Sequence, residues 1–200
     1  MQGCHYLRIG LWLTVGSIPS SALAAGPYLV QDIGLPFPIG VPPSVTPTAI
    51  NNQGQVVGVY DFQVGMSGTQ YQGFSWQNGV FSNLPGSLLR PTDVNDSGLV
   101  VGYEYLYGSG TNRPFTWRVG DASGTPLPPI GDVPDFARRD AAFGVNDVGD
   151  VVGMTADIIN PGPNSNNGTK WTDGAPVAVG GTMLTAINKA IAYNLLPEHK

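Results

Sequence analysis

Hydrophobic and polar residues alternate in short runs between turn-forming residues along most of this chain. Three runs share one pattern, in which a β-branched residue precedes Asn-x-x-Gly and a Val-Val-Gly triplet follows. Asn suits the first position of a type I turn, and Gly tolerates the positive φ of the fourth. Each copy therefore predicts a hairpin, with β-branched residues favouring its outgoing strand. The predicted turn residues are Asn51, Gly54, Asn95, Gly98, Asn146 and Gly149.

The copies recur in phase with a second marker. An eroded fourth copy covers residues 185–190 and contains Asn188, and the four asparagines are 44, 51 and 42 residues apart. A tryptophan follows the first three asparagines after 25, 22 and 25 residues, at Trp76, Trp117 and Trp171. Two markers in phase predict an internal duplication. The predicted units are 28–76, 77–117 and 118–171, with an eroded copy at 172–200.

The repeat predicts an all-β fold of antiparallel hairpin units, similar in unit size to the blades of a β-propeller. Three units and partial copies fall short of the four to eight blades that close a propeller, so exposed sheet edges need a partner or a cap. A truncated chain, a homo-oligomer that completes the open edges and an open β arrangement are the alternatives. Leu184, Ile187, Ile191 and Leu195 follow helical spacing, which predicts a short C-terminal helix that covers an edge.

The motifs resemble a known family. Residues 142–153 read Ala-Phe-Gly-Val-Asn-Asp-Val-Gly-Asp-Val-Val-Gly, and 28–34 read Tyr-Leu-Val-Gln-Asp-Ile-Gly. With the Phe-x-Trp strand, these segments are similar to the HAF repeats of bacterial extracellular repeat proteins. The resemblance implies a secreted or surface repeat domain of propeller-like fold and no settled activity. The family's His-Ala-Phe triplet is replaced here by Gln72-Gly73-Phe74 and Arg113-Pro114-Phe115.

The first 25 residues match a secretory signal peptide. Arg8 precedes an apolar stretch at 9–15, and Ala22-Leu23-Ala24 supplies the small residues of a cleavage site. The apolar stretch is too short for a membrane span, so we expect export without a stable membrane anchor. The mature chain, 26–200, is then the β-repeat domain.

The net charge and the scarcity of Cys and His limit the functions that this chain can have. Fourteen acidic and nine basic residues give a net charge of −5, which disfavours nucleic-acid binding. The single cysteine is Cys4 and the two histidines are His5 and His199, so the sequence predicts no His-based catalysis, no Cys/His metal site and no cofactor.

Carboxylates suggest two further activities. Asp96 and Asp147 follow repeat asparagines and could indicate calcium loops, but the first copy, Asn51-Asn52-Gln53-Gly54, has no carboxylate. Turn formation is therefore the favoured interpretation, and a single calcium site stays open. Glycoside hydrolysis needs two carboxyl groups that flank one bond, and no local motif marks such a pair around Glu104.

Aromatic and basic side chains supply weak candidates for ligand binding. Tyr103, Tyr105 and Tyr107 alternate along one predicted strand and could pack or form the rim of a surface site. Arg138 and Arg139 could bind an anion or form a neutralised, solvated patch with the flanking Asp135 and Asp140. The recurrent tryptophans are predicted to be core residues.

These patterns favour a secreted β-repeat scaffold that binds a protein or a carbohydrate and has no catalytic site. The alternatives are a carboxylate enzyme acting on polysaccharide, with the tyrosine strand as its sugar platform, and a truncated relic of a larger repeat protein.

Overall fold

The computed structural model describes most of the chain after residue 32. All described residues belong to one compact unit, 33–200. The predicted signal segment 1–25, Tyr107 and the residues from Asn188 onward lie outside the described residues. The described ranges are 33, 44–63, 69–86, 89–106, 108–131, 134–159, 166–180 and 183–187.

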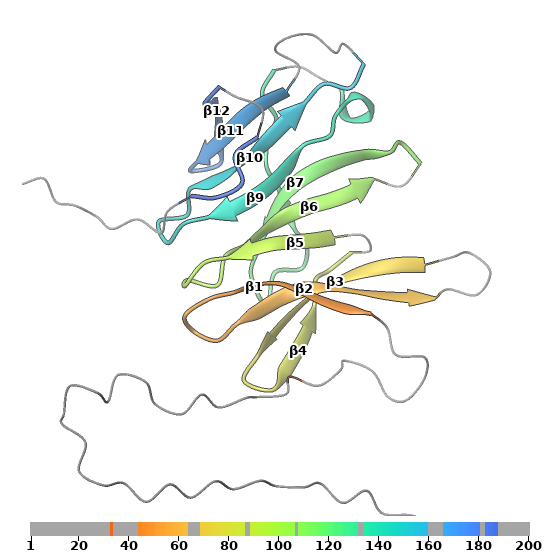
Figure 1. Cartoon of the computed structure of the whole chain (residues 1–200), viewed down its shortest axis with the longest axis vertical. Helices are drawn as coiled ribbons and strands as arrows, with labels where there is room; N and C mark the ends of the chain where they lie inside the picture. The colour runs from red at the N-terminus through yellow and green to blue at the C-terminus, as the bar shows by residue number, and fades with distance from the viewer. Residues whose placement is uncertain are drawn as a thin grey trace, which may run out of the picture. The chain divides into compact units, whose positions relative to one another are not determined.

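Within the described residues, twelve strands form three antiparallel sheets of four strands, each sheet in simple sequence order (Figure 1). The first sheet contains β1 (Val45–Ile50), β2 (Val56–Gln63), β3 (Thr69–Gln77) and β4 (Val80–Asn83). The second contains β5 (Leu89–Val94), β6 (Val100–Leu106), β7 (Thr111–Trp117) and β8 (Thr125–Pro126). The third contains β9 (Ala141–Val145), β10 (Val151–Ala156), β11 (Asn166–Thr172) and β12 (Ala175–Ala178), preceded by a 3₁₀ turn, η3 (Asp135–Ala137).

The predicted all-β fold of antiparallel hairpins is confirmed. Each sheet takes its last strand from residues that follow its tryptophan, so the sheets span 45–83, 89–126 and 141–178. No helix within the described residues is long and apolar enough to cross a membrane.

The Asn-x-x-Gly turns form as the sequence predicts. In the second sheet, the amide of Gly98 donates to the carbonyl oxygen of Asn95 at 3.0 Å, and the φ of Gly98 is 78°. Asn95 Oδ1 accepts the amides of Ser97 and Leu99 at 3.1 and 2.9 Å. The side chain therefore closes the turn that its own backbone begins, as Asn commonly does. The turns at Asn51 and Asn146 have the same backbone hydrogen bond from Gly to Asn. In both turns Asn Oδ1 also accepts the amide of the residue four positions later.

The glycine of each Val-Val-Gly triplet allows the first strand of its sheet to approach closely. A Cβ atom at Gly102 would lie 2.1 Å from the carbonyl oxygen of Arg90, which no side chain can occupy. At this point the register of β5 against β6 shifts between Pro91 and Asp93. The triplet glycine thus accommodates an irregularity in the first strand.

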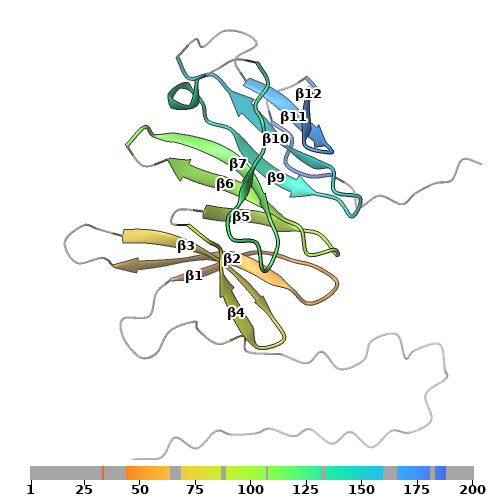
Figure 2. The ribbon, with the colours of Figure 1, turned by 180° about the vertical axis from the view of Figure 1, so that it is seen from behind.

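The two valines of the triplet serve opposite faces of one sheet. Val100 joins a core with Val57 and Leu84 of the first sheet and its connection, whereas Val101 joins a core with Val145 and Trp171 of the third sheet. Successive side chains of a strand point to opposite faces, so a sheet with neighbours on both sides needs both valines. β5 contacts β1, β2 and β3, and β9 contacts β5, β6 and β7, which places the second sheet between the others (Figures 1 and 2).

Short segments cover the remaining faces of the first and third sheets. On the first sheet, Tyr60, Phe74 and Trp76 form a third cluster, against which Ile33 packs. On the third sheet, the amide of Leu184 donates to the carbonyl oxygen of Gly153 at 3.2 Å. The C-terminal segment was expected to cover a sheet edge, but residues 183–187 instead lie across three adjacent strands, beside Gly144 of β9, Gly153 of β10 and Gly168 of β11.

The helical conformation expected for that segment is absent from residues 183–187, which have no regular secondary structure. A Cβ atom at Gly144 would lie 3.3 Å from Ala186 Cα and 3.4 Å from the Ile187 nitrogen. Contact with β9 and β10 therefore overrides the helical spacing of Leu184 and Ile187. The other predicted helix residues lie outside the described residues.

Candidate functional site

One hydrogen-bond ladder connects the three Asn-x-x-Gly turns. Asn51 Nδ2 donates to the carbonyl oxygen of Asn95 at 2.8 Å, and Asn95 Nδ2 donates to that of Asn146 at 2.8 Å. All three asparagines are buried. Sequence reasoning identified them as turn residues and missed this second role, which the identity of the residue in all copies could have suggested.

The aspartates that follow the repeat asparagines strengthen the same ladder. Asp96 Oδ1 accepts the amide of Asn52 at 2.9 Å, and Asp147 Oδ1 accepts the amide of Asp96 at 3.0 Å. These carboxylates bond to the neighbouring turn rather than converge on one point. Within the described residues, no group of three or more His, Cys, Asp or Glu side chains could hold a metal ion.

The recurrent tryptophans are core residues, as the sequence predicts. Trp76, Trp117 and Trp171 expose 6%, 3% and 1% of their surface. The Trp171 Nε1 atom also donates to the carbonyl oxygen of Pro128 at 2.7 Å, so the polar edge of that ring is satisfied. These rings have too little exposed surface to stack on a ligand.

The two described residues of the tyrosine strand lie on one face of β6. Tyr103 pairs with Pro114 and Tyr105 pairs with Asn112 on β7. Tyr103 is half-buried and Tyr105 is 40% exposed. Neither lines either of the two pockets described below, and Tyr107 lies outside the described residues.

The paired arginines have different environments. Arg138 forms ion pairs with Asp135 and with Asp140, 3.7 Å from its Nε atom, and only 11% of its side chain is exposed. Arg139 is exposed, and its Nε atom donates to the carbonyl oxygen of Gly110 at 3.3 Å. Arg138 is therefore neutralised and only slightly exposed, whereas Arg139 lies on the solvated surface.

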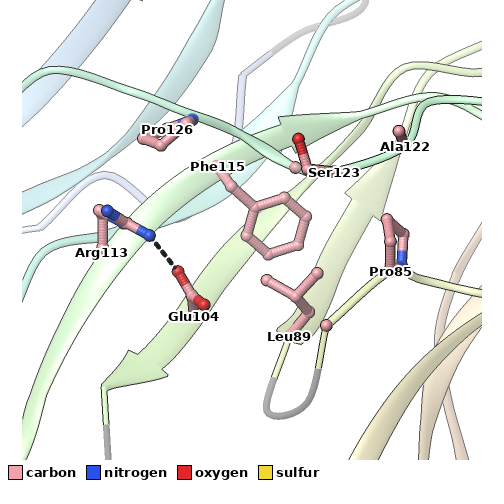
Figure 3. A pocket seen from close by; sticks show the side chains of 10 residues that line it. Pro85, Leu89, Glu104, Arg113, Phe115, Ala122, Ser123 and Pro126 are labelled. Atoms are coloured by element: carbon pink, nitrogen blue, oxygen red, sulfur yellow. Dashed lines mark hydrogen bonds and ion pairs between the residues drawn. The ribbon is translucent and has the colours of Figure 1, made fainter.

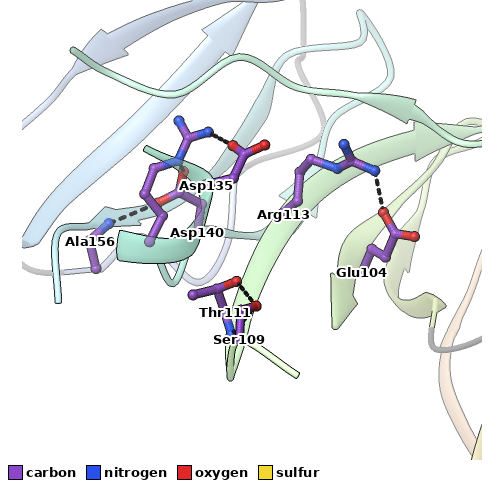
Figure 4. A network of polar contacts seen from close by, with 8 residues as sticks. Glu104, Ser109, Thr111, Arg113, Asp135, Asp140 and Ala156 are labelled. Atoms are coloured by element: carbon purple, nitrogen blue, oxygen red, sulfur yellow. Dashed lines mark hydrogen bonds and ion pairs between the residues drawn. The ribbon is translucent and has the colours of Figure 1, made fainter. Parts of the chain in front are cut away.

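Asp140 is a buried carboxylate at the join between the second and third sheets (Figure 4). Its backbone amide donates to Asn112 of β7, and its Oδ1 atom accepts the amide of Ala156 of β10 at 2.9 Å. Burial raises the pKa of Asp140 to about 6, against the opposing effects of the Ala156 hydrogen bond and the Arg138 charge. With 2% of its surface exposed, Asp140 holds the connecting segment to both sheets rather than facing solvent.

A pocket of about 330 Å³ opens beside the second sheet (Figure 3). Its walls include Pro85, Leu89, Phe115 and Pro126, together with small residues of the β7–β8 connection. An ion pair lies at one side, where Arg113 Nη2 and Glu104 Oε2 are 2.6 Å apart. The pair is half-exposed, with 37% of the Arg113 side chain and 27% of the Glu104 side chain accessible.

A second pocket of about 260 Å³ shares Arg113 and Pro126 with the first. Prolines line much of it, and Arg138, Asp135 and Asp140 supply its charged groups. The shared residues make the two pockets neighbours, so one elongated ligand could contact both. This region, which we call the Arg113 site, comprises the two pockets together.

Sequence reasoning named Arg138 and Arg139 as weak ligand-binding candidates; the structure brings Arg138 to this site and leaves Arg139 outside it, and Arg113 was missed. Arg113 and Gln72 occupy the same position of the repeat, because each lies four residues before the tryptophan of its unit. Gln72 Nε2 donates to the carbonyl oxygen of Leu84 at 2.6 Å, whereas Arg113 faces a pocket. The departure of this position from its copy was the signal available in the sequence.

No protein-family model, curated protein or solved structure matches this chain.

Proposed function

We propose that this chain is an exported β-repeat scaffold that binds a ligand at the Arg113 site. The observation that carries the proposal is that Arg113 is half-exposed and lines two adjacent pockets on a sheet held from both sides. Sites that combine apolar walls with a few polar groups on a rigid support are the usual form of ligand pockets. The signal-peptide pattern of residues 1–25 supports export.

The same proposal includes a propeller-like arrangement of the sheets and membership of the HAF-repeat family. The first strands β1, β5 and β9 contact one another in order, as the inner strands of neighbouring blades do. The turn ladder runs along the same sequence of strands. Light scattering coupled to size exclusion would test the accompanying expectation of a homo-oligomer, which requires a particle larger than one chain.

Polysaccharide hydrolysis has less support as an alternative. Glu104 is engaged by Arg113, and Asp140, whose raised pKa would suit a general acid, exposes only 2% of its surface. A general acid must come within hydrogen-bond reach of the substrate. The geometry therefore favours retention of a ligand over turnover.

Thermal unfolding with a mixed library of oligosaccharides, short peptides and small metabolites tests the binding function. We expect at least one compound to raise the melting temperature, since a ligand that binds only the folded state stabilises it. Ser123→Tyr, which places a ring in the first pocket, should abolish the effect, whereas Val119→Tyr on the same connection should not, because Val119 lies outside both pockets. Mass spectrometry should recover the ligand unchanged. No stabilisation by any class of compound would contradict the proposal.

A further inference from the structure

We infer that the ligand of the Arg113 site is a neutral oligosaccharide, recognised through neighbouring hydroxyl groups by Arg113 and Glu104. This inference rests on the proposed binding function and specifies its ligand. Its basis is a donor and an acceptor held side by side at the border of an apolar pocket.

The ion pair offers both kinds of hydrogen-bonding group that a sugar needs. A guanidinium only donates and a carboxylate only accepts, whereas a hydroxyl does both. The 2.6 Å contact engages Arg113 Nη2 and Glu104 Oε2. Two neighbouring hydroxyls can therefore accept from another guanidinium nitrogen and donate to Glu104 Oε1 without breaking the pair.

The charge balance of the pair disfavours an ionic ligand. Arg113 and Glu104 neutralise each other at 2.6 Å, so an incoming carboxylate would meet Glu104 and an incoming ammonium group would meet Arg113. A neutral polyhydroxylated ligand meets neither repulsion. Charge-assisted hydrogen bonds from both partners would then orient it.

The remaining pocket surface suits the apolar face of a sugar ring. Pro85 and Pro126 are at least partly exposed and lie on either side of Phe115, with Leu89 below them in the close-up view (Figure 3). Ring C–H groups can pack on such surfaces while the hydroxyls reach the ion pair. The pocket therefore has an apolar side and a polar side, which match the C–H face and the hydroxyl groups of a pyranose ring.

Continuation into the second pocket favours a chain of sugars over a single one. The second pocket begins at Arg113 and Pro126 and adds Asp135 as a further acceptor, with Arg138 paired to it. The Asp135 side chain is 61% exposed, so its oxygens are accessible. A linear oligosaccharide would thus meet a second arginine–carboxylate pair after leaving the first.

Amide NMR spectra of the ¹⁵N-labelled full chain test this inference directly. The probes are maltopentaose, cellopentaose, xylopentaose and chitopentaose, with a proline decapeptide as the alternative ligand. We expect at least one pentasaccharide to shift the amide signals of Arg113, Phe115 and Gly124, with a Kd of about 1 mM or tighter. Glu104→Gln should weaken this binding about tenfold, the effect of losing one charged hydrogen bond.

Matched variants identify the site. Arg113→Gln should also weaken binding about tenfold, and Val119→Tyr should leave the Kd within about twofold. The spectra report folding, so an unfolded variant is recognised and the inference is judged on the other. Shifts caused by the decapeptide alone would overturn the sugar inference and leave the binding function standing. Failure of every pentasaccharide to shift these signals would overturn it as well.

Discussion

A single side chain performs two tasks in each turn of this fold. Asn95 Oδ1 closes its own turn through two backbone amides, and Asn95 Nδ2 donates to the carbonyl oxygen of Asn146 in the next turn. Asp and Ser can perform the first task, but neither has an amide donor for the second. This explains why Asn, among the usual turn formers, occupies this position in all three turns.

Asn95→Asp tests the second task. The substitution keeps Oδ1 and removes the donor to Asn146, leaving a carboxylate buried beside a carbonyl oxygen. We expect unfolding by urea at pH 7 to show a loss of about 3 kcal/mol. The loss should shrink as the pH falls, because burial raises the pKa of the new carboxyl and its protonated form can donate. Asn78→Asp, in an exposed turn, should cost little; equal losses for both variants would argue against the ladder.

Asp140 should make the protein more stable at pH 5 than at pH 7. Its folded-state pKa of about 6 lies above the usual aspartate value of 3.8, so as the pH falls through this range the folded state binds the extra proton and stability rises. The gain from pH 7 to pH 5 should be about 1 kcal/mol in urea unfolding. Hydrogen bonding with Lys170 lowers the pKa of Asp150, which therefore does not titrate in this window. Asp140→Asn should remove the gain, and an unchanged profile would contradict the assignment.

At the scale of the element, the second strand of each sheet is specified by three adjacent residues. In the second sheet the two valines fill the cores on either side, and in every sheet the glycine admits the irregular first strand. Because the first strand approaches within van der Waals distance of the glycine, a valine cannot take the place of that glycine. The valines of the triplet thus reflect the burial of the sheet, and its glycine reflects the close approach of the neighbouring first strand.

Gly102→Ala should destabilise the fold strongly. The new Cβ atom would lie 2.1 Å from the Arg90 oxygen, and backbone cannot move aside as a side-chain end can. We expect a loss of about 3 kcal/mol in chemical unfolding. Gly124→Ala is the control, because its Cβ atom would meet only the Phe115 side chain at 3.3 Å, and its loss should stay below about 1 kcal/mol. A mild effect at Gly102 would mean that β5 can shift.

Hydrophobic spacing predicted a helix for the segment 183–187, and tertiary contacts explain why it does not form one. Val145 donates its amide to Asp93 Oδ2 of the preceding sheet at 2.9 Å, and Ile187 approaches Gly144 in the corresponding way. Asp93 and Gly144 both precede a repeat asparagine by two residues, and Val145 and Ile187 both precede one directly. The segment therefore occupies the place of a fourth first strand. Its eroded repeat motif was a better guide to its position than the spacing of Leu184 and Ile187.

At the scale of the whole described structure, two of the three hydrophobic clusters are shared by pairs of sheets. Val57 and Leu84 share a core with Phe115, and Val101 shares one with Trp171. Burial of such side chains contributes about 1.5–3 kcal/mol each. A sheet that unfolds alone therefore exposes apolar surface on its neighbour as well as its own.

The three sheets should consequently unfold together. Native-state amide exchange of Val57, Val101 and Val152, at equivalent positions of the three second strands, should give opening free energies within about 1 kcal/mol of one another. Much faster exchange at Val152 than at Val57 and Val101 would show that the third sheet opens independently. Comparison of the amides within one spectrum supplies the internal control.

Much of the fold could be predicted from the sequence, and less of the candidate site. Turns, strand types and the core tryptophans follow from local rules that act within a few residues, as at Asn95 and Gly98. The Arg113 site is lined by residues from segments that the sequence separates, such as Pro85 and Pro126. Arg138 pairs with the flanking Asp135 and Asp140, but its low exposure depends on the path of a connection that no local rule fixes.

The direction of the asparagine ladder bears on how such a chain can change its length in evolution. Every linking amide points from an earlier turn to a later one, and both links use the same atoms. A duplicated unit inserted between two existing units would find a donor before it and an acceptor after it without any compensating substitution. Duplication of a unit within the array therefore needs no further substitution to preserve the ladder. A point mutation at a ladder asparagine, in contrast, removes a hydrogen bond that joins two units.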